Sequence, residues 1–132
     1  MLIQRFKFAK MLLIGIAIFS SFALSAQNKA HIDFKETIFD YGEIPFKGNG
    51  ECTFTLTNTG KGPLVLNEVT TSCGCTAVEW PQKPILNGET ADITIKYDTK
   101  RQGTFNKSII IKSNADNTPL SLEIKGTVLS KN

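Results

Sequence analysis

The segment that decides the fold reads Cys52-Thr53-Phe54-Thr55-Leu56-Thr57. Cys52, Phe54 and Leu56 occupy every second position, and threonines occupy the positions between them. Side chains of a β-strand point alternately to the two faces of a sheet, so the apolar residues share one face and the threonines the other. A strand with one buried and one solvated face is typical of an antiparallel sheet.

Period-two alternation recurs in residues 91–97 and 120–128. Clusters of Gly, Pro, Asn and Asp separate these segments from shorter apolar runs, as expected for turns. The expected strands are residues 31–34, 37–39, 52–57, 64–69, 91–97, 104–113 and 120–128. About seven short strands at this spacing predict an all-β chain with an immunoglobulin-like antiparallel β-sandwich fold.

Two of the expected strands depart from simple alternation. In residues 104–113, Lys107 falls on the same face as Phe105 and Ile109, so we expect a β-bulge or an edge position there. In residues 64–69, apolar side chains fall on both faces. That strand is therefore expected to be buried on both sides or bulged.

The first 26 residues have the composition of a secretory signal peptide. Basic residues precede an uncharged apolar run at residues 11–19, and small residues follow up to Ala26. The apolar run is short for a membrane span, so we expect cleavage after Ala26 and no stable membrane anchor afterwards. No cysteine lies near the cut, which argues against a lipid anchor. We predict an exported protein, periplasmic or secreted, with one domain at residues 27–132.

The charge balance changes once the signal peptide is set aside. The chain has 15 basic and 12 acidic residues, and the basic residues Arg5, Lys7 and Lys10 belong to the expected signal peptide. The remaining part is therefore neutral, which suits nucleic-acid binding poorly. The only histidine, His31, lies near an end of the domain that we expect to be mobile. A hydrolytic triad is therefore not expected, and the chain is predicted not to be an enzyme.

Several short blocks of the sequence follow the order of a known pattern. They are FDYGEI (39–44), FTLTNTG (54–60), PLVL (63–66), SCGCT (72–76), NGE (87–89), GTF (103–105) and SN (113–114). From Ile32 to Val128 the chain resembles a bacterial family of exported immunoglobulin-like domains, domain-of-unknown-function family fifteen-seventy-three. It is also similar to abnormal-spindle/hydin-type sandwiches. The resemblance implies a sandwich shaped like a scaffolding domain and brings no assigned reaction; Cys52 is an addition to the pattern.

The cysteines are Cys52, Cys73 and Cys75, an odd number that leaves at least one without an intramolecular disulfide partner. Export exposes thiols to oxidising conditions, so we expect them to be bonded, buried or metal-bound. Cys52 lies two residues before Phe54 and therefore on the same face of the strand, so its sulfur should point into the core. A bond from Cys52 to Cys73 or Cys75 would close a loop of about twenty residues and contribute on the order of 3 kcal/mol. We favour this structural cross-link, with a structural Cys73–Cys75 bond as a variant.

Two reactive alternatives remain for the Cys73-Gly74-Cys75 stretch. As thiolates, the pair can bind a soft ion such as copper or zinc, and only Cys52, Glu68 or Glu79 could complete the ligand set within the chain.

As a disulfide, the pair closes a small ring, which makes such a bond easier to reduce and suits thiol–disulfide exchange. Exchange enzymes lower a thiol pKa with a helix N-terminus or a cation. No helix is expected here, and the nearest cations in sequence are Lys61 and Lys83.

Other residues give weaker signals. Trp80 is expected in the core rather than at a contact surface. Residues 106–108 fit the glycosylation sequon but lie within an expected strand, so modification is not expected. Four acids near turns make a calcium site conceivable, although such acids are usually only solvated: Asp40, Glu43, Asp98 and Asp116.

The sequence therefore predicts an exported, non-catalytic immunoglobulin-like module with a structural or interaction role and no cofactor. It would act on a protein partner or on itself through loops or an exposed strand edge. The alternative is a thiol–disulfide or copper-handling protein that uses Cys73 and Cys75.

Overall fold

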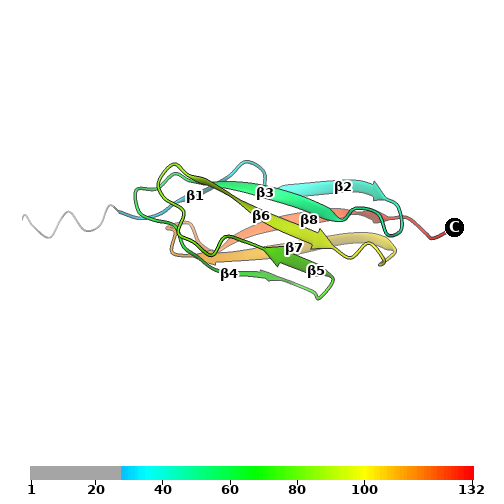
Figure 1. Ribbon diagram of the computed structural model, residues 1–132. Helices are drawn as coiled ribbons and strands as arrows, with labels where there is room; N and C mark the ends of the chain where they lie inside the picture. Colours follow the sequence, from blue (N-terminus) through cyan, green and yellow to red (C-terminus); the bar gives the residue numbers. More distant parts are fainter. Residues whose placement is uncertain (1–27) are drawn as a thin grey trace, which may run out of the picture.

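A computed structural model describes residues 28–132 as two packed β-sheets (Figure 1). The strands are β1 (Ile32–Phe34), β2 (Ile38–Ile44), β3 (Glu51–Asn58), β4 (Leu66–Thr71), β5 (Thr76–Glu79), β6 (Thr90–Tyr97), β7 (Gly103–Ser113) and β8 (Leu120–Val128). The all-β immunoglobulin-like sandwich predicted from the sequence is confirmed, with β5 as a strand that the sequence analysis missed. The expected signal peptide at residues 1–26 lies outside the described residues.

The two sheets have the strand orders β1-β3-β6-β5 and β2-β8-β7-β4. All pairs are antiparallel except β2 with β8, which run parallel. The chain changes sheets between β1 and β2 along one side of the sandwich and between β4 and β5 along the other. The second of these crossings is the segment that contains Cys73 and Cys75.

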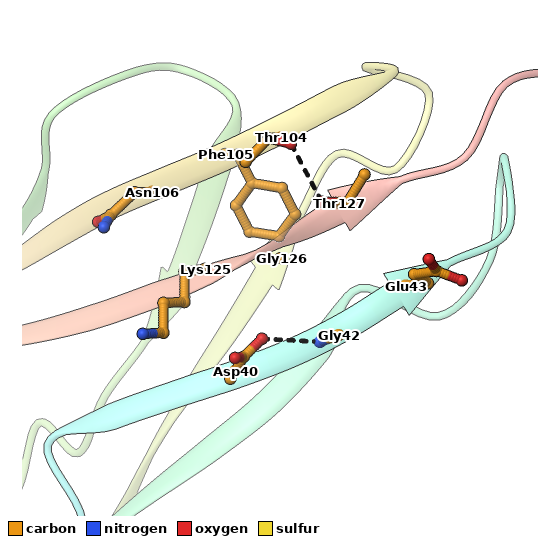
Figure 2. A pocket seen from close by; sticks show the side chains of 9 residues that line it. All are labelled: Asp40, Gly42, Glu43, Thr104, Phe105, Asn106, Lys125, Gly126 and Thr127. Carbon is orange, nitrogen blue, oxygen red and sulfur yellow. Dashed lines mark hydrogen bonds between the residues drawn. The ribbon is translucent and has the colours of Figure 1, made fainter.

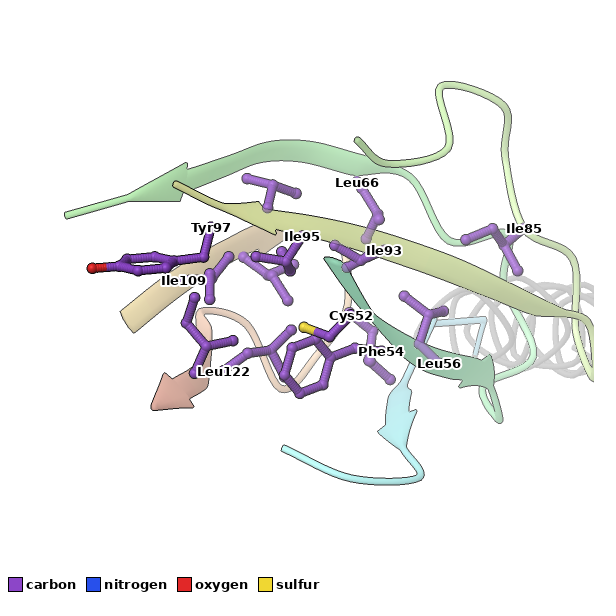
Figure 3. Close-up of a cluster of buried hydrophobic side chains, with 14 of the residues drawn as sticks. Cys52, Phe54, Leu56, Leu66, Ile85, Ile93, Ile95, Tyr97, Ile109 and Leu122 are labelled. Carbon is purple, nitrogen blue, oxygen red and sulfur yellow. The ribbon is translucent and has the colours of Figure 1, made fainter. Parts of the chain in front are cut away.

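The alternation of residues 52–57 forms the centre of the core (Figure 3). Cys52, Phe54 and Leu56 are buried on β3, where Phe54 lies opposite Ile93 of β6. Apolar side chains from the second sheet cover them, among them Ile109 of β7. Burial of these side chains removes apolar surface from water, which is the main favourable contribution to folding.

The strand expected to be irregular at Lys107 is regular. Strand β7 is a central strand and pairs with β8 from Gly103 to Ile111 without a shift, so the expected bulge or edge position at Lys107 is wrong. The last pair between β4 and β7 joins Thr71 to Ile109, so Lys107 lies beyond the end of β4. Its side chain is half-buried.

The irregularity lies instead in β4, where the register with β7 shifts between Leu66 and Glu68. A bulge turns the following side chains to the other face. Leu64, Leu66 and Val69 are therefore all buried, whereas Val65 is exposed. Of the two alternatives predicted for this segment, the bulged strand is the one that occurs.

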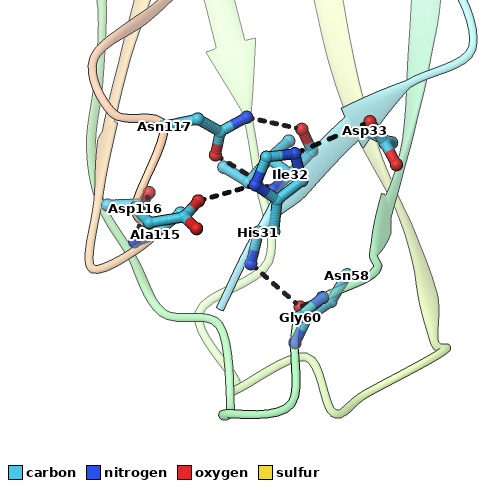
Figure 4. Close-up of polar contacts among 9 residues, drawn as sticks. His31, Ile32, Asp33, Asn58, Gly60, Ala115, Asp116 and Asn117 are labelled. Atoms are coloured by element: carbon cyan, nitrogen blue, oxygen red, sulfur yellow. Dashed lines mark hydrogen bonds and ion pairs between the residues drawn. The ribbon is translucent and has the colours of Figure 1, made fainter. Parts of the chain in front are cut away.

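Polar side chains fasten the loops at the end of the sandwich that contains residue 28 (Figure 4). Asn58 is fully buried, donates to the carbonyls of Gly62 (2.9 Å) and Ile85 (2.8 Å), and accepts from Gly60 N (3.0 Å). His31 Nδ1 lies 2.6 Å from Asp116 Oδ1 in the β7–β8 loop. The expectation that His31 lies near a mobile end is therefore wrong: the segment around it is held by side chains far away in sequence.

Candidate functional site

Cys73 and Cys75 form a disulfide in the connection between β4 and β5, with their Cα atoms 5.4 Å apart. Strands β4 and β5 are each an edge strand of their own sheet. The two sulfurs differ in environment, since Cys75 is 3% exposed whereas Cys73 is half-buried. Nothing lies within 4 Å of the place where a side chain of Gly74 would begin, so the tip of the loop is open to solvent.

Hydrogen bonds set the conformation of this loop on both sides of the disulfide. Thr71 Oγ1 donates to Cys73 O at 2.9 Å, and Asp98 N of the β6–β7 loop donates to Cys75 O at 2.8 Å. The Cys75 amide donates to Cys73 Sγ at 3.3 Å, and Thr76 Oγ1 lies 3.7 Å from Cys75 Sγ. Each sulfur therefore has a polar neighbour of its own within hydrogen-bond distance.

Cys52 is a free, buried thiol, so the expected cross-link from Cys52 to Cys73 or Cys75 is wrong. Strand order gives the reason, because β3 and β5 both pair with β6 and lie on opposite sides of it. Two strand spacings separate them by roughly 9–10 Å. This separation exceeds the Cα separation of about 7 Å that a disulfide can bridge. The predicted inward direction of Cys52 is confirmed.

The surroundings of Cys52 suppress its reactivity. Burial raises the pKa of the Cys52 thiol, while the neighbouring Tyr41 hydroxyl acts in the opposite direction and is the smaller effect. Burial likewise raises the pKa of Tyr41, whose hydroxyl donates to Gly50 O at 2.8 Å. Thiolates, not thiols, are nucleophiles and metal ligands. Cys52 is therefore a core residue and not a partner of the exposed pair.

The other side chains considered for a metal site do not gather around the cysteines. Within residues 28–132, no three side chains of His, Cys, Asp or Glu come together in a metal-binding arrangement. Glu68 instead lies 3.6 Å from Lys112 Nζ. The acids near turns also have local partners: Asp40 accepts from Gly42 N at 2.8 Å, and Asp98 lies 3.7 Å from Arg101.

The cations near the disulfide are not the ones that sequence proximity suggested. Lys61 precedes β4 and Lys83 follows β5, so both lie at the opposite ends of these strands from the cysteines. Two other cations lie closer in the fold. Arg101 is in the loop whose Asp98 amide bonds to Cys75, and Lys107 lies on β7 two residues beyond the end of its pairing with β4. Arg101 and Lys107 are brought toward the cysteines by strand pairing, which the sequence alone does not reveal.

The disulfide contributes little to stability by constraining the unfolded chain. A cross-link that encloses one intervening residue removes much less entropy than one that closes twenty residues, about 1.5 kcal/mol against about 3 kcal/mol by the same relation. It also joins neighbouring parts of one loop and does not connect the sheets. The larger structural role expected for a Cys52 cross-link therefore does not transfer to Cys73–Cys75.

A shallow groove of about 430 Å³ lies over β2, β8 and β7 (Figure 2). Asp40 and Glu43 line its β2 side, and Lys125 lies on β8. Some of its polar groups already have partners: Thr104 and Thr127 lie 3.1 Å apart, and Asn106, the residue of the sequon, donates to Glu123 outside the groove at 2.8 Å. The groove offers no arrangement of nucleophile and base.

Trp80 lies directly after β5 and packs, half-buried, against the core, as predicted. Its indole nitrogen is buried and has no hydrogen-bond partner among the described residues. Buried indole N–H groups usually have a partner, so this side of β5 is one place where the polar contacts are incomplete.

Comparison with known proteins supports the fold and the family. The family profile described as protein of unknown function DUF1573 matches residues 32–128. No curated protein matches the chain. Within residues 28–132 there is no helix of the length and apolar character needed to cross a membrane.

Three solved structures illustrate the similarity in fold. A protein of unknown function from Porphyromonas gingivalis matches 80% of this chain and 50% of its own, with 21% identity and a TM-score of 0.69. The PapD-like domain 7 of human CEP192 matches 83% and 93%, with 6% identity and a TM-score of 0.66. A chaperone–tip adhesion subunit complex of Csu pili from Acinetobacter baumannii matches 74% and 57%, with 11% identity and a TM-score of 0.53.

The chain thus spans half the length of the P. gingivalis protein. At these identities the structures establish a shared immunoglobulin-like, PapD-like fold. The profile match covers most of the chain, from the first strand to the last. The chain belongs to the DUF1573 family of proteins of unknown function.

Proposed function

We propose that the chain is an exported, non-catalytic module that binds a protein partner by adding a strand of that partner to the free edge of β5. The observation that carries the proposal is that the outer edge of β5 has no neighbouring strand within the described residues. Strand β5 pairs with β6 on one side only, and its register from Thr76 to Glu79 is regular.

The direction of the free backbone groups follows from the pairing with β6. Asp98 N donates to Cys75 O, so Cys75 and Asp98 form a hydrogen-bonded pair. Hydrogen-bonded and non-hydrogen-bonded pairs alternate along an antiparallel ladder. Ala77 and Glu79, two and four residues after Cys75, therefore also direct their N–H and C=O groups to β6. Thr76 and Val78 then direct their N–H and C=O groups away from the sheet. An extended peptide can bind to these groups, which is the basis of β-strand addition.

The other edges in the described part of the chain are protected against such pairing. Strand β2 has a register shift between Asp40 and Glu43, with Gly42 at a φ of 64°, and β4 is bulged. Strand β1 has only three residues, one of them Asp33. Bulges, charges and short length are the usual means of blocking an edge. Strand β5 is also short and carries one charged residue, Glu79 at its end, but its register is regular and it has no bulge, proline or lysine.

Two further observations support a non-catalytic role. The only histidine, His31, is hydrogen-bonded to Asp116 and lies at the other end of the sandwich from the cysteines. The fold also resembles that of a chain in the chaperone–tip adhesion subunit pre-assembly complex of Csu pili, that is, of a protein that assembles with another protein. Export follows from the signal peptide predicted at residues 1–26.

Photo-crosslinking in cells tests the proposal directly. A photoreactive residue placed at Ala77, whose side chain is exposed on β5, should give a discrete adduct with one partner, whereas the same residue at Thr55 of β3 should not. Val78→Pro, which removes the edge N–H, should abolish the adduct formed from position 77, and Val78→Thr, which keeps the N–H, should preserve it. Equal adducts at positions 77 and 55, or an adduct unaffected by Val78→Pro, would contradict binding at this edge.

A further inference from the structure

Beyond partner binding, we infer that Cys73–Cys75 is an exchangeable disulfide that accepts two electrons from a protein dithiol, with Cys73 as the sulfur that is attacked. The chemistry that recognises the site is a pair of neighbouring thiols on another protein. Three features of the loop support this inference: the solvent access to each sulfur, the polar groups that face each sulfur, and the contacts that hold the loop without the disulfide.

Access distinguishes the two sulfurs. Cys73 is half-buried beside the open tip at Gly74, whereas Cys75 is 3% exposed. Exchange requires a thiolate to reach one sulfur of the disulfide, and the rate depends on that access. The absence of a side chain at Gly74 leaves the approach to Cys73 clear. Cys75 is then the sulfur that leaves.

Polar neighbours are available for the negative charge that develops. When Cys75 leaves as a thiolate, the Thr76 hydroxyl, 3.7 Å from Cys75 Sγ, can donate a hydrogen bond to it. The Cys75 amide, 3.3 Å from Cys73 Sγ, serves the other sulfur in the reverse reaction. Hydrogen bonds to a charged group are stronger than neutral ones, so both contacts stabilise the thiolate more than the disulfide.

The reaction balances without any further reactant. A thiolate of the incoming dithiol attacks Cys73 Sγ, the bond between the two sulfurs breaks, and its electron pair passes to Cys75 Sγ, which takes up a proton. The partner's second thiol loses its proton, attacks the partner sulfur of the mixed disulfide and releases Cys73 as a thiol. The chain gains two electrons and two protons, and the partner becomes a disulfide.

The loop is held by bonds that do not depend on the disulfide. Thr71 Oγ1 binds Cys73 O on one side, and Asp98 N binds Cys75 O on the other. Reduction therefore leaves the two thiols near one another and ready to be oxidised again. A disulfide that can open and close without unfolding the protein is what an exchange site requires.

The first test uses dithiothreitol on the native oxidised chain, followed by alkylation and mass spectrometry. We expect reduction without denaturant, with the label on Cys73 and Cys75 and none on Cys52 until the protein is unfolded. Reduction that occurs only in denaturant would overturn the inference and leave a purely structural bond. Purification of the chain with both thiols reduced and resistant to oxidation by oxidised glutathione would also overturn it.

The second test assigns the roles of the two sulfurs. In Cys75→Ser the remaining thiol of the pair is Cys73, and in Cys73→Ser it is Cys75; the buried Cys52 is present in both variants. With oxidised glutathione as the probe, Cys73 should form the mixed disulfide at least about tenfold faster, because it is more accessible. Equal rates, or a faster Cys75, would overturn the assignment.

The third test addresses Thr76 as a positioning residue. Thr76→Val should slow reduction by dithiothreitol by about tenfold, since it removes a hydrogen bond to the leaving thiolate. Thr76→Ser keeps a hydroxyl and should restore most of the rate. Thr70→Val, at an exposed threonine of the neighbouring β4, is the matched control and should leave the rate unchanged. An unchanged rate in a folded Thr76→Val variant would remove Thr76 from the mechanism.

Discussion

The two ends of the sandwich are held together in different ways. At one end, the buried Asn58 and the half-buried Asn117 bind backbone groups of segments distant in sequence, with Asn58 at the centre. At the other end, the connection between β4 and β5 is held by a local disulfide, two hydrogen bonds and an open glycine. The comparison indicates that the first end stabilises the fold and that the second can change its covalent state at little cost to the fold.

The largest effect is expected at the stabilising end. Asn58→Ala removes hydrogen bonds to three loop groups and leaves them unsatisfied in a buried site, which should lower the free energy of unfolding by about 3 kcal/mol. Chemical denaturation measures this change. Asn67→Ala, at an exposed position of β4, is the matched control and should stay within about 0.5 kcal/mol of the parent. Similar values for the two variants would remove the distinction between the ends.

A smaller effect is expected from opening the disulfide. The double variant Cys73→Ser with Cys75→Ser should lower the free energy of unfolding by about 1.5 kcal/mol, since the bond encloses a single residue. The melting temperature should fall by roughly 6–12 °C for a domain of this size. Calorimetry checks both numbers. Failure of the double variant to fold would show that the cysteine end is as important for the fold as the Asn58 end.

Replacement of the buried Cys52 should change the free energy of unfolding by as much as removal of the disulfide, or by less. Cys52→Ala leaves a small cavity and should cost about 1 kcal/mol, whereas Cys52→Val fills the site and should be nearly neutral. Denaturation curves of the two variants give the comparison. Since Cys52 is free, neither variant should add a reactive thiol on the exposed loop. A new thiol titrating in the native variants would instead indicate a disulfide that includes Cys52.

The smallest effect is expected for His31→Ala. Its contact with Asp116 is exposed on both sides and should contribute below about 1 kcal/mol. Its removal should still loosen the segment that leads into β1, because the contact joins residues distant in sequence. Amide hydrogen exchange at residues 29–32 should become faster, with little change in β3. Unchanged exchange there would show that Asn58 and Asn117 hold the segment without His31.

Sequence reasoning succeeded where the signal is local and failed where it depends on strand order. Alternation predicted the inward direction of Cys52 because the two-residue period of a strand fixes the face. It could not exclude a Cys52 cross-link, since β3 and β5 are separated by β6, a strand that comes later in the chain. Strand β5 was missed because its inward positions are Thr76 and Val78 while an alanine faces outward, which gives little contrast.

Two further differences have physical causes of the same kind. Asn58 stands before Thr59-Gly60, in a composition typical of a turn, yet its side chain is buried because two loops and the segment before β1 converge on it. Lys107 suggested an irregular strand because its face is otherwise apolar. The position tolerates a lysine because β4 ends before it. Neither the convergence of loops nor the end of a neighbouring strand is visible in the local sequence.

Amide hydrogen exchange of the oxidised and reduced protein tests the central claim most directly. If the cysteine end changes its covalent state independently of the fold, reduction should alter exchange only at residues 71–76 and 97–99. Protection in β3 and around Asn58 should remain the same in both states. Loss of protection that spreads into β3 or reaches Asn58 would contradict the account, because it would make the disulfide a support of the whole sandwich.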